Sequence, residues 1–238
     1  MQKLWTQIQD NVVFLLITAG IVVGLGLLAR LAEKWLPHRS VTPARRVSII
    51  GICAAIAVVL HILDFPLVFL APEFYKLDFS EVPVLIGGFF LGPSAAVAIE
   101  GVKILLKLLL KGTSTAFVGD FANFFVGCSF VLPATIWYHT HKNKTGAIVG
   151  LVIGTLTMTV LGTAFNAVYL LPKFSQLYGI PLDVIIGMGT AINSSVSGVF
   201  SFVAICVAPL NLIKGGTVSL LTMLLYKRVA RPLFHVSE

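Results

Sequence analysis

The sequence predicts an all-α polytopic membrane protein, on the basis of its composition, its hydropathy and the length of its apolar runs. Of the 238 residues, 57% are hydrophobic and only 11% are charged, whereas soluble domains are about 25% charged. The mean hydropathy is +0.96, and the apolar runs reach about 20 residues, the length with which a helix crosses a hydrocarbon core. No soluble core could bury this much apolar surface, so we expect a transmembrane helical bundle.

The positive charge of the chain follows the pattern of a topology signal. The formal net charge is +7, but the lysines and arginines lie in short clusters between the apolar runs, as they do at the cytoplasmic ends of spans. We therefore expect a lipid bilayer and no nucleic acid as a partner. The three cysteines lie inside apolar runs without metal-ligand or disulfide spacing, so we expect no metal site.

The first apolar run, Val12 to Leu31, is long enough to span a bilayer and lacks the small-residue cleavage pattern of a signal peptide. We interpret residues 1–45 as an extra N-terminal transmembrane helix and a basic linker. The linker should be cytoplasmic, which would leave Met1 extracellular. The basic residues in and directly beside this linker are Arg30, Lys34, Arg39, Arg45 and Arg46.

Six further spans are predicted between residues 46 and 231, followed by a cytoplasmic tail, 232–238. The first two surround an acidic loop that should face outward, and the second and third form a tight hairpin at Gly92 and Pro93. The predicted stretches are Val47 to Phe65, two spans within Pro83 to Leu110, Ala116 to Tyr138, Thr145 to Leu171, and one crossing within Leu182 to Tyr226.

Proline and polar residues predict where the last two stretches are interrupted. We expect the fifth span to end at Pro172, because proline breaks helical hydrogen bonding. The final 45 residues would form a helix of about 67 Å, more than twice the core thickness. We therefore expect breaks near Asn193–Ser197 and at Pro209, giving one crossing and an external or re-entrant helix.

Ionisable and amide side chains within the spans are the candidate functional residues. An ionisable side chain costs at least about 2.5 kcal/mol in a membrane unless it has a partner or a cavity. Glu100 and Lys103 share one helix face and could form a structural ion pair, or Lys103 could contact a ligand. Asp120 and Asn123 could form an interhelical clamp with a lysine or bind a ligand. Asn166 could bond another helix or a ligand.

The segment from Pro209 to Gly216 carries the most suggestive combination of residues. Pro209 would free a backbone carbonyl, while Asn211 and Lys214 offer hydrogen-bonding groups on one helix face. A broken helix of this kind is where transporters hold their substrates. In contrast, the sequence has no nucleotide-binding loop, hydrolase elbow or zinc-protease motif, so we expect no catalytic residues and no enzyme activity.

The residues described so far, with several longer motifs, resemble the riboflavin-specific (RibU) S components of energy-coupling factor (ECF) transporters. S components are the substrate-capture subunits of these transporters. The resemblance covers about four fifths of the chain, from Arg45 to Arg231. It rests on KLDFSEVP (76–83), LIGGFFLGP (85–93), Glu100-x-x-Lys103, GDFANF (119–124), GCSFVLPA (127–134) and PLNLIKG (209–215).

This resemblance implies a six-helix S-component core that binds riboflavin on its extracellular side, beneath the loop that joins the first two core spans. The vitamin would be a transported ligand and not a cofactor. Asn211 and Lys214 match positions that hydrogen-bond the flavin in the family. The other candidate substrate-binding residues are Asp78, Phe79, Lys103, Asp120, Asn123 and Asn166.

The family also implies partners, namely a transmembrane coupling protein and two ATPase subunits. Small residues on the first core span match the family's docking patch for the coupling protein, although small-residue spacing is a weak signal that ordinary packing within the bundle also explains. These residues are Gly51, Ala54, Ala55 and Ala57.

Three points leave alternatives open. The extra N-terminal helix is additional to the family pattern, and Leu210 replaces its usual phenylalanine. Lys103, Lys107 and Lys111 form a basic strip that could snorkel, or could accept a phosphate and make flavin mononucleotide a cargo. The alternatives to riboflavin are another vitamin or, less in keeping with the motifs, a membrane enzyme.

Overall fold

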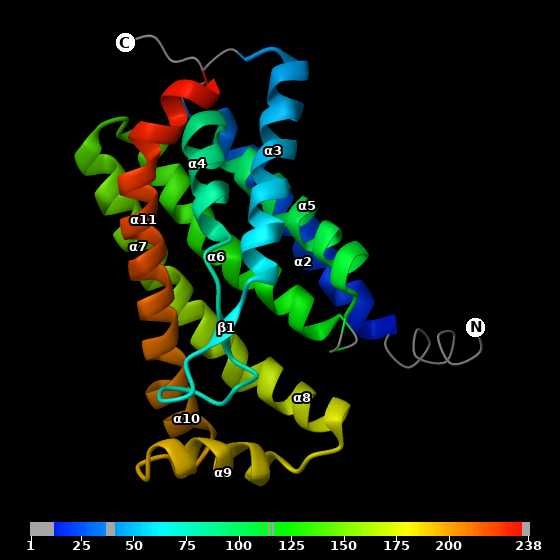
Figure 1. Cartoon of the computed structure of the whole chain (residues 1–238). Coiled ribbons are helices and arrows are strands. Elements are labelled where there is room, and N and C mark those ends of the chain that lie inside the picture. Colours follow the sequence, from blue (N-terminus) through cyan, green and yellow to red (C-terminus); the bar gives the residue numbers. More distant parts are fainter. Residues whose placement is uncertain (1–11, 37–40, 114, 116, 235–238) are drawn as a thin grey trace.

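The structure is a computed structural model that describes residues 12–36, 41–113, 115 and 117–234. Most of these residues are helical, and the long helices run side by side in a bundle (Figure 1). The predictions for Met1, for Arg39 and for the end of the tail lie outside the described residues.

The helices follow one another along the chain, with a two-stranded antiparallel hairpin after the second of them. In chain order the elements are α2 (Val12–Lys34), α3 (Pro43–Ile62), β1 (Phe65–Pro66), β2 (Lys76–Leu77), α4 (Glu81–Leu91), α5 (Pro93–Lys111), α6 (Val118–Thr140), α7 (Lys144–Phe165), the π-helical segment η1 (Asn166–Leu170), α8 (Leu171–Tyr178), α9 (Leu182–Ile192), α10 (Val199–Phe202), the π-helical segment η2 (Val203–Val207) and α11 (Ala208–Phe234).

Five of these helical stretches are long and apolar enough to cross a membrane. They contain α2, α3, α6, α7 with α8, and α10 with α11. Helix α4 is shorter, with 11 residues, and α5 carries Glu100, Lys103, Lys107 and Lys111. The division of the second and third core spans at Gly92 is confirmed, because α4 ends and α5 begins on either side of this glycine.

The extra N-terminal helix α2 packs on the bundle against α5 and α6. Its last turn is fixed by Arg46, which donates to Glu33 Oε1 at 3.1 Å and to Ser94 Oγ at 2.7 Å. Helix α3 begins at Pro43, earlier than the predicted Val47, because proline is favoured in the first turn, where no amide donor is needed.

Helices α6 and α7 approach closely because α7 has glycines at positions that face α6. A Cβ atom on Gly150 would lie 2.7 Å from the Ala134 carbonyl oxygen, and one on Gly154 would lie 2.6 Å from the Phe130 carbonyl oxygen. Without side chains at these positions, the two backbones can pack directly against each other.

The prediction that Pro172 and Pro209 end their helices is wrong, and two π-helical segments explain why. Each segment ends two residues before one of these prolines: the Leu171 amide donates to Asn166 O, and the Ala208 amide donates to Val203 O. These wider turns let the chain accommodate a residue that lacks an amide donor and would clash in a regular α-helix. The predicted break near Asn193–Ser197 is confirmed.

The short helix α9 lies between the Pro181 N-cap and this break and has 11 residues. Figure 1 shows α9 across one end of the bundle, next to α10 and the hairpin loop, while the α6–α7 turn and the last turn of α11 lie at the opposite end. We refer to these as the α9 end and the α6–α7 end of the bundle.

Candidate ligand-binding site

A cavity of about 460 Å³ is lined in part by the hairpin loop and α8, which lie toward the α9 end of the bundle (Figure 1). Its wall is formed by residues of α3, the hairpin loop, α5, the loop after α5, α6, η1, α8 and α11. Its size falls within the range of small-molecule sites. The cavity combines buried polar groups with aromatic rings, the composition that such sites commonly have.

Six of the eight predicted substrate-binding residues line this cavity: Asp78, Asp120, Asn123, Asn166, Asn211 and Lys214. They are far apart in the sequence, and the fold brings them together. The remaining two, Phe79 and Lys103, are not among the lining residues. Phe79 packs against the main core cluster, with its ring centroid 6.0 Å from that of Phe65, and Lys103 is fully buried behind the cavity.

Asn211 presents the clearest unused hydrogen-bonding group in the cavity wall. Its side chain is buried, and its Nδ2 group makes no hydrogen bond with any described residue. Gly162 makes room for it, because a Cβ there would lie 2.9 Å from this nitrogen. A buried donor without a partner is costly, so a ligand acceptor would remove that cost.

The hairpin loop is fastened over the cavity by Tyr75 and Asp78. The Tyr75 hydroxyl donates to Asn166 Oδ1 at 2.7 Å, while Asn166 Nδ2 donates to the Gly162 carbonyl oxygen at 2.7 Å. Burial raises the pKa of Tyr75, so this hydroxyl keeps its proton and acts as a donor. Asn166 therefore bonds both its own helix and the loop, as well as lining the cavity.

Aromatic rings form one side of the cavity, and they come from the loop and from α8. Phe74, Tyr75, Phe174 and Tyr178 all line it. The Phe74 and Phe174 rings meet edge to face with centroids 5.9 Å apart, and the Phe174 and Tyr178 centroids are 5.7 Å apart. Such rings offer flat apolar surfaces to an aromatic ligand.

Beneath the cavity lies a buried charge network that joins the loop to α4, α5 and α11. Lys214 Nζ lies 3.0 Å from Asp78 Oδ2 and 3.1 Å from Glu81 Oε1. Lys103 Nζ lies 2.6 Å from Glu100 Oε2 and 3.4 Å from Glu81 Oε1. The predicted Glu100–Lys103 pair therefore exists, but as half of a larger network in which Glu81 contacts both lysines.

Several groups around Asp78 stabilise the negative charge of its carboxylate. Its Oδ1 accepts from the Ser80 amide at 2.8 Å, and its Oδ2 lies 3.4 Å from His61 Nδ1. Burial alone would raise the pKa of Asp78, but Lys214 and His61 hold it well below its usual range. Asp78 thus stays ionised and keeps the end of the loop attached to α11.

The three lysines of the predicted strip lie in two different environments. Lys103 belongs to the buried network, whereas Lys107 and Lys111 line the cavity. Lys107 Nζ lies 2.6 Å from Asp120 Oδ1, which makes the expected interhelical clamp, and Lys111 Nζ lies 3.7 Å from Asp64 Oδ1. Both cavity lysines therefore have carboxylate partners.

The small residues of α3 point in two directions. Gly51 and Ala55 are exposed, and a Cβ on Gly51 would meet nothing within 4 Å. Ala54 and Ala57 are fully buried in the main core cluster. The docking prediction is therefore wrong for Ala54 and Ala57, which pack inside the bundle, and stays a prediction for Gly51 and Ala55.

Sequence reasoning did not identify several residues of this site. His61 has no recognisable ligand spacing in the sequence, and Glu81 and Tyr75 lie in or beside the acidic loop, where nothing in the sequence sets them apart. Phe174 and Tyr178 lie beyond Pro172, where the span was expected to end. Their spacing of four residues is a helical signal that could have placed both rings on one face.

Comparisons with known proteins agree with this arrangement. The family model described as "ECF transporter, substrate-specific component" matches residues 45–226. "Riboflavin transporter RibU" of Staphylococcus aureus is 36% identical over 186 residues, which cover 78% of this chain and 90% of the relative. "Riboflavin transporter FmnP" of Bacillus subtilis is 31% identical over 183 residues, which cover 76% of this chain and 90% of the relative.

A solved structure described as "Structure and mechanism of the S component of a bacterial ECF transporter" has a similar fold. It is 35% identical in sequence with a TM-score of 0.63, and the match covers 81% of this chain and 99% of the other. With the apolar helices described above, these matches identify a multi-pass membrane protein whose relatives are transporters. The chain belongs to the family of substrate-specific components of ECF transporters.

Proposed function

We propose that this chain is the substrate-binding subunit of an ECF-type uptake system and that it binds riboflavin in the cavity beneath the hairpin loop. The observation that carries this proposal is the agreement between the relatives and the cavity. Two relatives that align over about three quarters of the chain are named riboflavin transporters, and the cavity has polar and aromatic groups that suit a flavin.

The chemistry of riboflavin matches both kinds of lining residue. Its ring system has apolar faces, which the rings of Phe74, Phe174 and Tyr178 can cover. The ring edge carries carbonyl and nitrogen groups, for which the unbonded Asn211 Nδ2 is a suitable donor. The ribityl hydroxyls need polar partners, and Asp120 and Asn123 are available in the cavity wall.

The cavity also favours riboflavin over flavin mononucleotide. A phosphate would need positive charge, and Lys107 and Lys111 line the cavity, but each already has a carboxylate partner. Binding a phosphate would bring its charge close to Asp120 and Asp64, which is unfavourable. We therefore propose riboflavin as the preferred cargo, with no catalytic step and no cofactor.

The direct test is an absorbance spectrum of the detergent-purified protein, followed by fluorescence-quenching titrations with riboflavin and flavin mononucleotide. Co-purified flavin and saturable riboflavin quenching, weaker with the mononucleotide, support the proposal. A protein that ignores both flavins but binds another vitamin would reassign the substrate. Chemical conversion of the bound flavin would instead indicate an enzyme.

Replacing Asn211 by alanine should weaken riboflavin binding by about 1–3 kcal/mol, or roughly 5- to 150-fold in Kd, because a buried ligand acceptor would lose its partner. The same quenching titration measures the change. Asn193→Ala is the matched control, because Asn193 lies in the break after α9 and does not line the cavity. Equal affinities in the two variants would contradict the assignment of Asn211.

We further propose that the chain assembles with a transmembrane coupling protein and two ATPase subunits, as the family implies, and that Gly51 and Ala55 form part of the docking surface. Both residues are exposed on α3, where small side chains allow another helix to approach closely. The proposed topology places the cavity outside the cell and the α6–α7 end in the cytoplasm. Lys142 and Lys144 at that end agree with this orientation.

Gly51→Leu should abolish co-purification with the coupling protein while leaving riboflavin affinity unchanged. The new side chain has room in the isolated chain, since a Cβ on Gly51 meets nothing within 4 Å, so only the docked partner would be obstructed. Gly187→Leu is the control, because Gly187 has the same free space but lies on α9. Normal complex formation by the Gly51 variant would remove this surface from the interface.

A further inference from the structure

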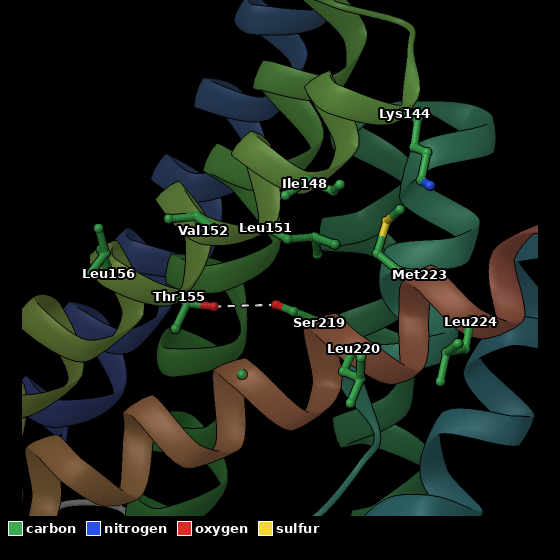
Figure 2. A pocket seen from close by; sticks show the side chains of 11 residues that line it. Lys144, Ile148, Leu151, Val152, Thr155, Leu156, Ser219, Leu220, Met223 and Leu224 are labelled. Carbon is green, nitrogen blue, oxygen red and sulfur yellow. Dashed lines mark hydrogen bonds between the residues drawn. The ribbon is translucent and has the colours of Figure 1, made fainter.

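An apolar groove lies between α7 and α11, separate from the ligand cavity. It has a volume of about 630 Å³, and Figure 2 shows its side chains along the two helices. The proposed function gives this groove no role. Its apolar walls are formed mainly by Ile148, Val152 and Leu156 of α7 and by Leu220, Met223 and Leu224 of α11.

One end of the groove, which we call its open end, lies near the α6–α7 turn, because Lys144 begins α7 and lines the groove. Farther from this end the two helices touch: a Cβ on Gly215 would lie 2.6 Å from Thr155 Cγ2, and Thr155 Oγ1 lies 3.3 Å from Ser219 Oγ (Figure 2). Next to this contact, a Cβ on Gly216 would meet nothing within 4 Å. Part of the groove is therefore open because Gly216 has no side chain to fill it.

The length of the groove matches one leaflet of a membrane. The lining residues of α7 extend from Lys144 to Leu156, which corresponds to about 18 Å of helix. Half of a hydrocarbon core is about 15 Å thick. With Lys144 at the membrane surface, the groove would extend from the edge of the hydrocarbon core to about its middle, as a single acyl chain would.

The charge at the groove's open end is positive. Lys144 is the first residue of α7 and lines the groove, and Figure 2 shows it at the same end as Met223. It is exposed, and no carboxylate lines the groove. A lysine at the membrane surface attracts anionic headgroups.

We propose that this groove is a binding site for an anionic phospholipid, with one acyl chain between α7 and α11 and the headgroup phosphate at Lys144. The apolar walls, the one-leaflet length and the lysine at the open end all fit this occupant. Such a lipid would fill the hollow beside the Thr155–Ser219 contact, between the two helices.

The test is native mass spectrometry of the purified full-length chain, titrated with phosphatidylglycerol or with phosphatidylcholine of the same acyl chains. We expect about fivefold tighter binding of phosphatidylglycerol, the effect of one lysine at the membrane surface. Lys144→Gln should remove this preference and leave phosphatidylcholine binding unchanged. Lys142→Gln is its control, because Lys142 is an exposed lysine before the same helix and does not line the groove.

Two further variants test the groove itself. Gly216→Phe and Val152→Phe fill it from opposite helices and should reduce the binding of both lipids. Gly24→Phe is their control, because Gly24 has equal free space but lies on α2. Circular dichroism and size-exclusion chromatography establish that each variant is folded.

Specific outcomes would overturn the proposal. Equal binding of the two lipids by the unmodified chain, or an equal loss in the Lys144 and Lys142 variants, would exclude the headgroup site. Unchanged lipid binding in both filled variants would exclude the groove as the acyl site. If these variants bound lipid normally but lost the coupling protein, the groove would be a protein interface instead.

Discussion

Replacing Lys214 by methionine is expected to lower the free energy of unfolding by about 3–5 kcal/mol, the usual cost of removing one partner from a buried ion pair. Lys214 lies between Asp78 and Glu81, so its loss leaves two buried carboxylates without their shared partner. Thermal unfolding in detergent measures the change. Because Asp78 holds the loop over the cavity, riboflavin affinity should fall in the same variant.

Lys76→Met provides the matched control for this prediction. Lys76 is also paired with a carboxylate, at 3.2 Å from Asp64 Oδ1, but its side chain is 42% exposed. Exposed pairs contribute about 0–1 kcal/mol, so this variant should unfold almost as the unmodified protein does. If both substitutions lowered the free energy of unfolding equally, burial would not be the reason that the Lys214 ion pairs stabilise the fold.

A second substitution separates charge balance from packing. Adding Asp78→Asn to the Lys214→Met variant removes one of the carboxylates that the lysine neutralised. We expect the double variant to be more stable than Lys214→Met alone, because the two sites contact each other and their effects should not add. Simple additivity would instead mean that Lys214 stabilises the fold through its aliphatic packing.

Gly154→Leu is expected to destabilise the bundle by about 3 kcal/mol or more, at the upper end of the range for overpacked positions. The obstacle is backbone: a Cβ at this position would lie 2.6 Å from the Phe130 carbonyl oxygen. A flexible side chain could move away, but helix α6 would have to shift as a whole. Thermal unfolding and the loss of riboflavin binding are the two measurements.

Gly20→Leu tests whether leucine itself is tolerated in a span. Gly20 lies within α2, and a Cβ there meets nothing within 4 Å. This variant should keep the stability and riboflavin affinity of the unmodified protein. If Gly154→Leu behaved in the same way, the close approach of α6 and α7 would not be needed for the fold.

The order of the helices along the chain could be predicted from the sequence, because each apolar run is visible by its own length and by the residues that bound it. The hairpin at Gly92 and the break near Asn193 were also predictable, because glycine and clustered polar residues act locally. Pro172 and Pro209 show the limit of this reasoning. A proline removes one amide donor, but the sequence alone does not show whether a wider helical turn will accommodate it.

The candidate site was predictable in part for a related reason. Asp120, Asn166, Asn211 and Lys214 stand out because a polar side chain in an apolar run needs a partner or a cavity. Lys103 stands out equally, yet it lies in the buried charge network behind the cavity. One helix has neighbours on several sides, so the sequence alone does not show which of them a polar side chain will face. Tyr75 was not distinguished from the other loop aromatics, since its hydrogen bond to Asn166 joins residues 91 positions apart.

The two π-helical segments, η1 and η2, have a consequence for how the site can change. Each segment contains one more residue than a regular α-helical turn. The extra residue rotates the side chains of the helix after the segment by about 100° relative to those of the helix before it. Helices α7 and α8, and likewise α10 and α11, can therefore keep separate helical registers. Substitutions that suit a new ligand near one of these segments therefore need not change the direction of the side chains that pack the bundle on the far side of the segment.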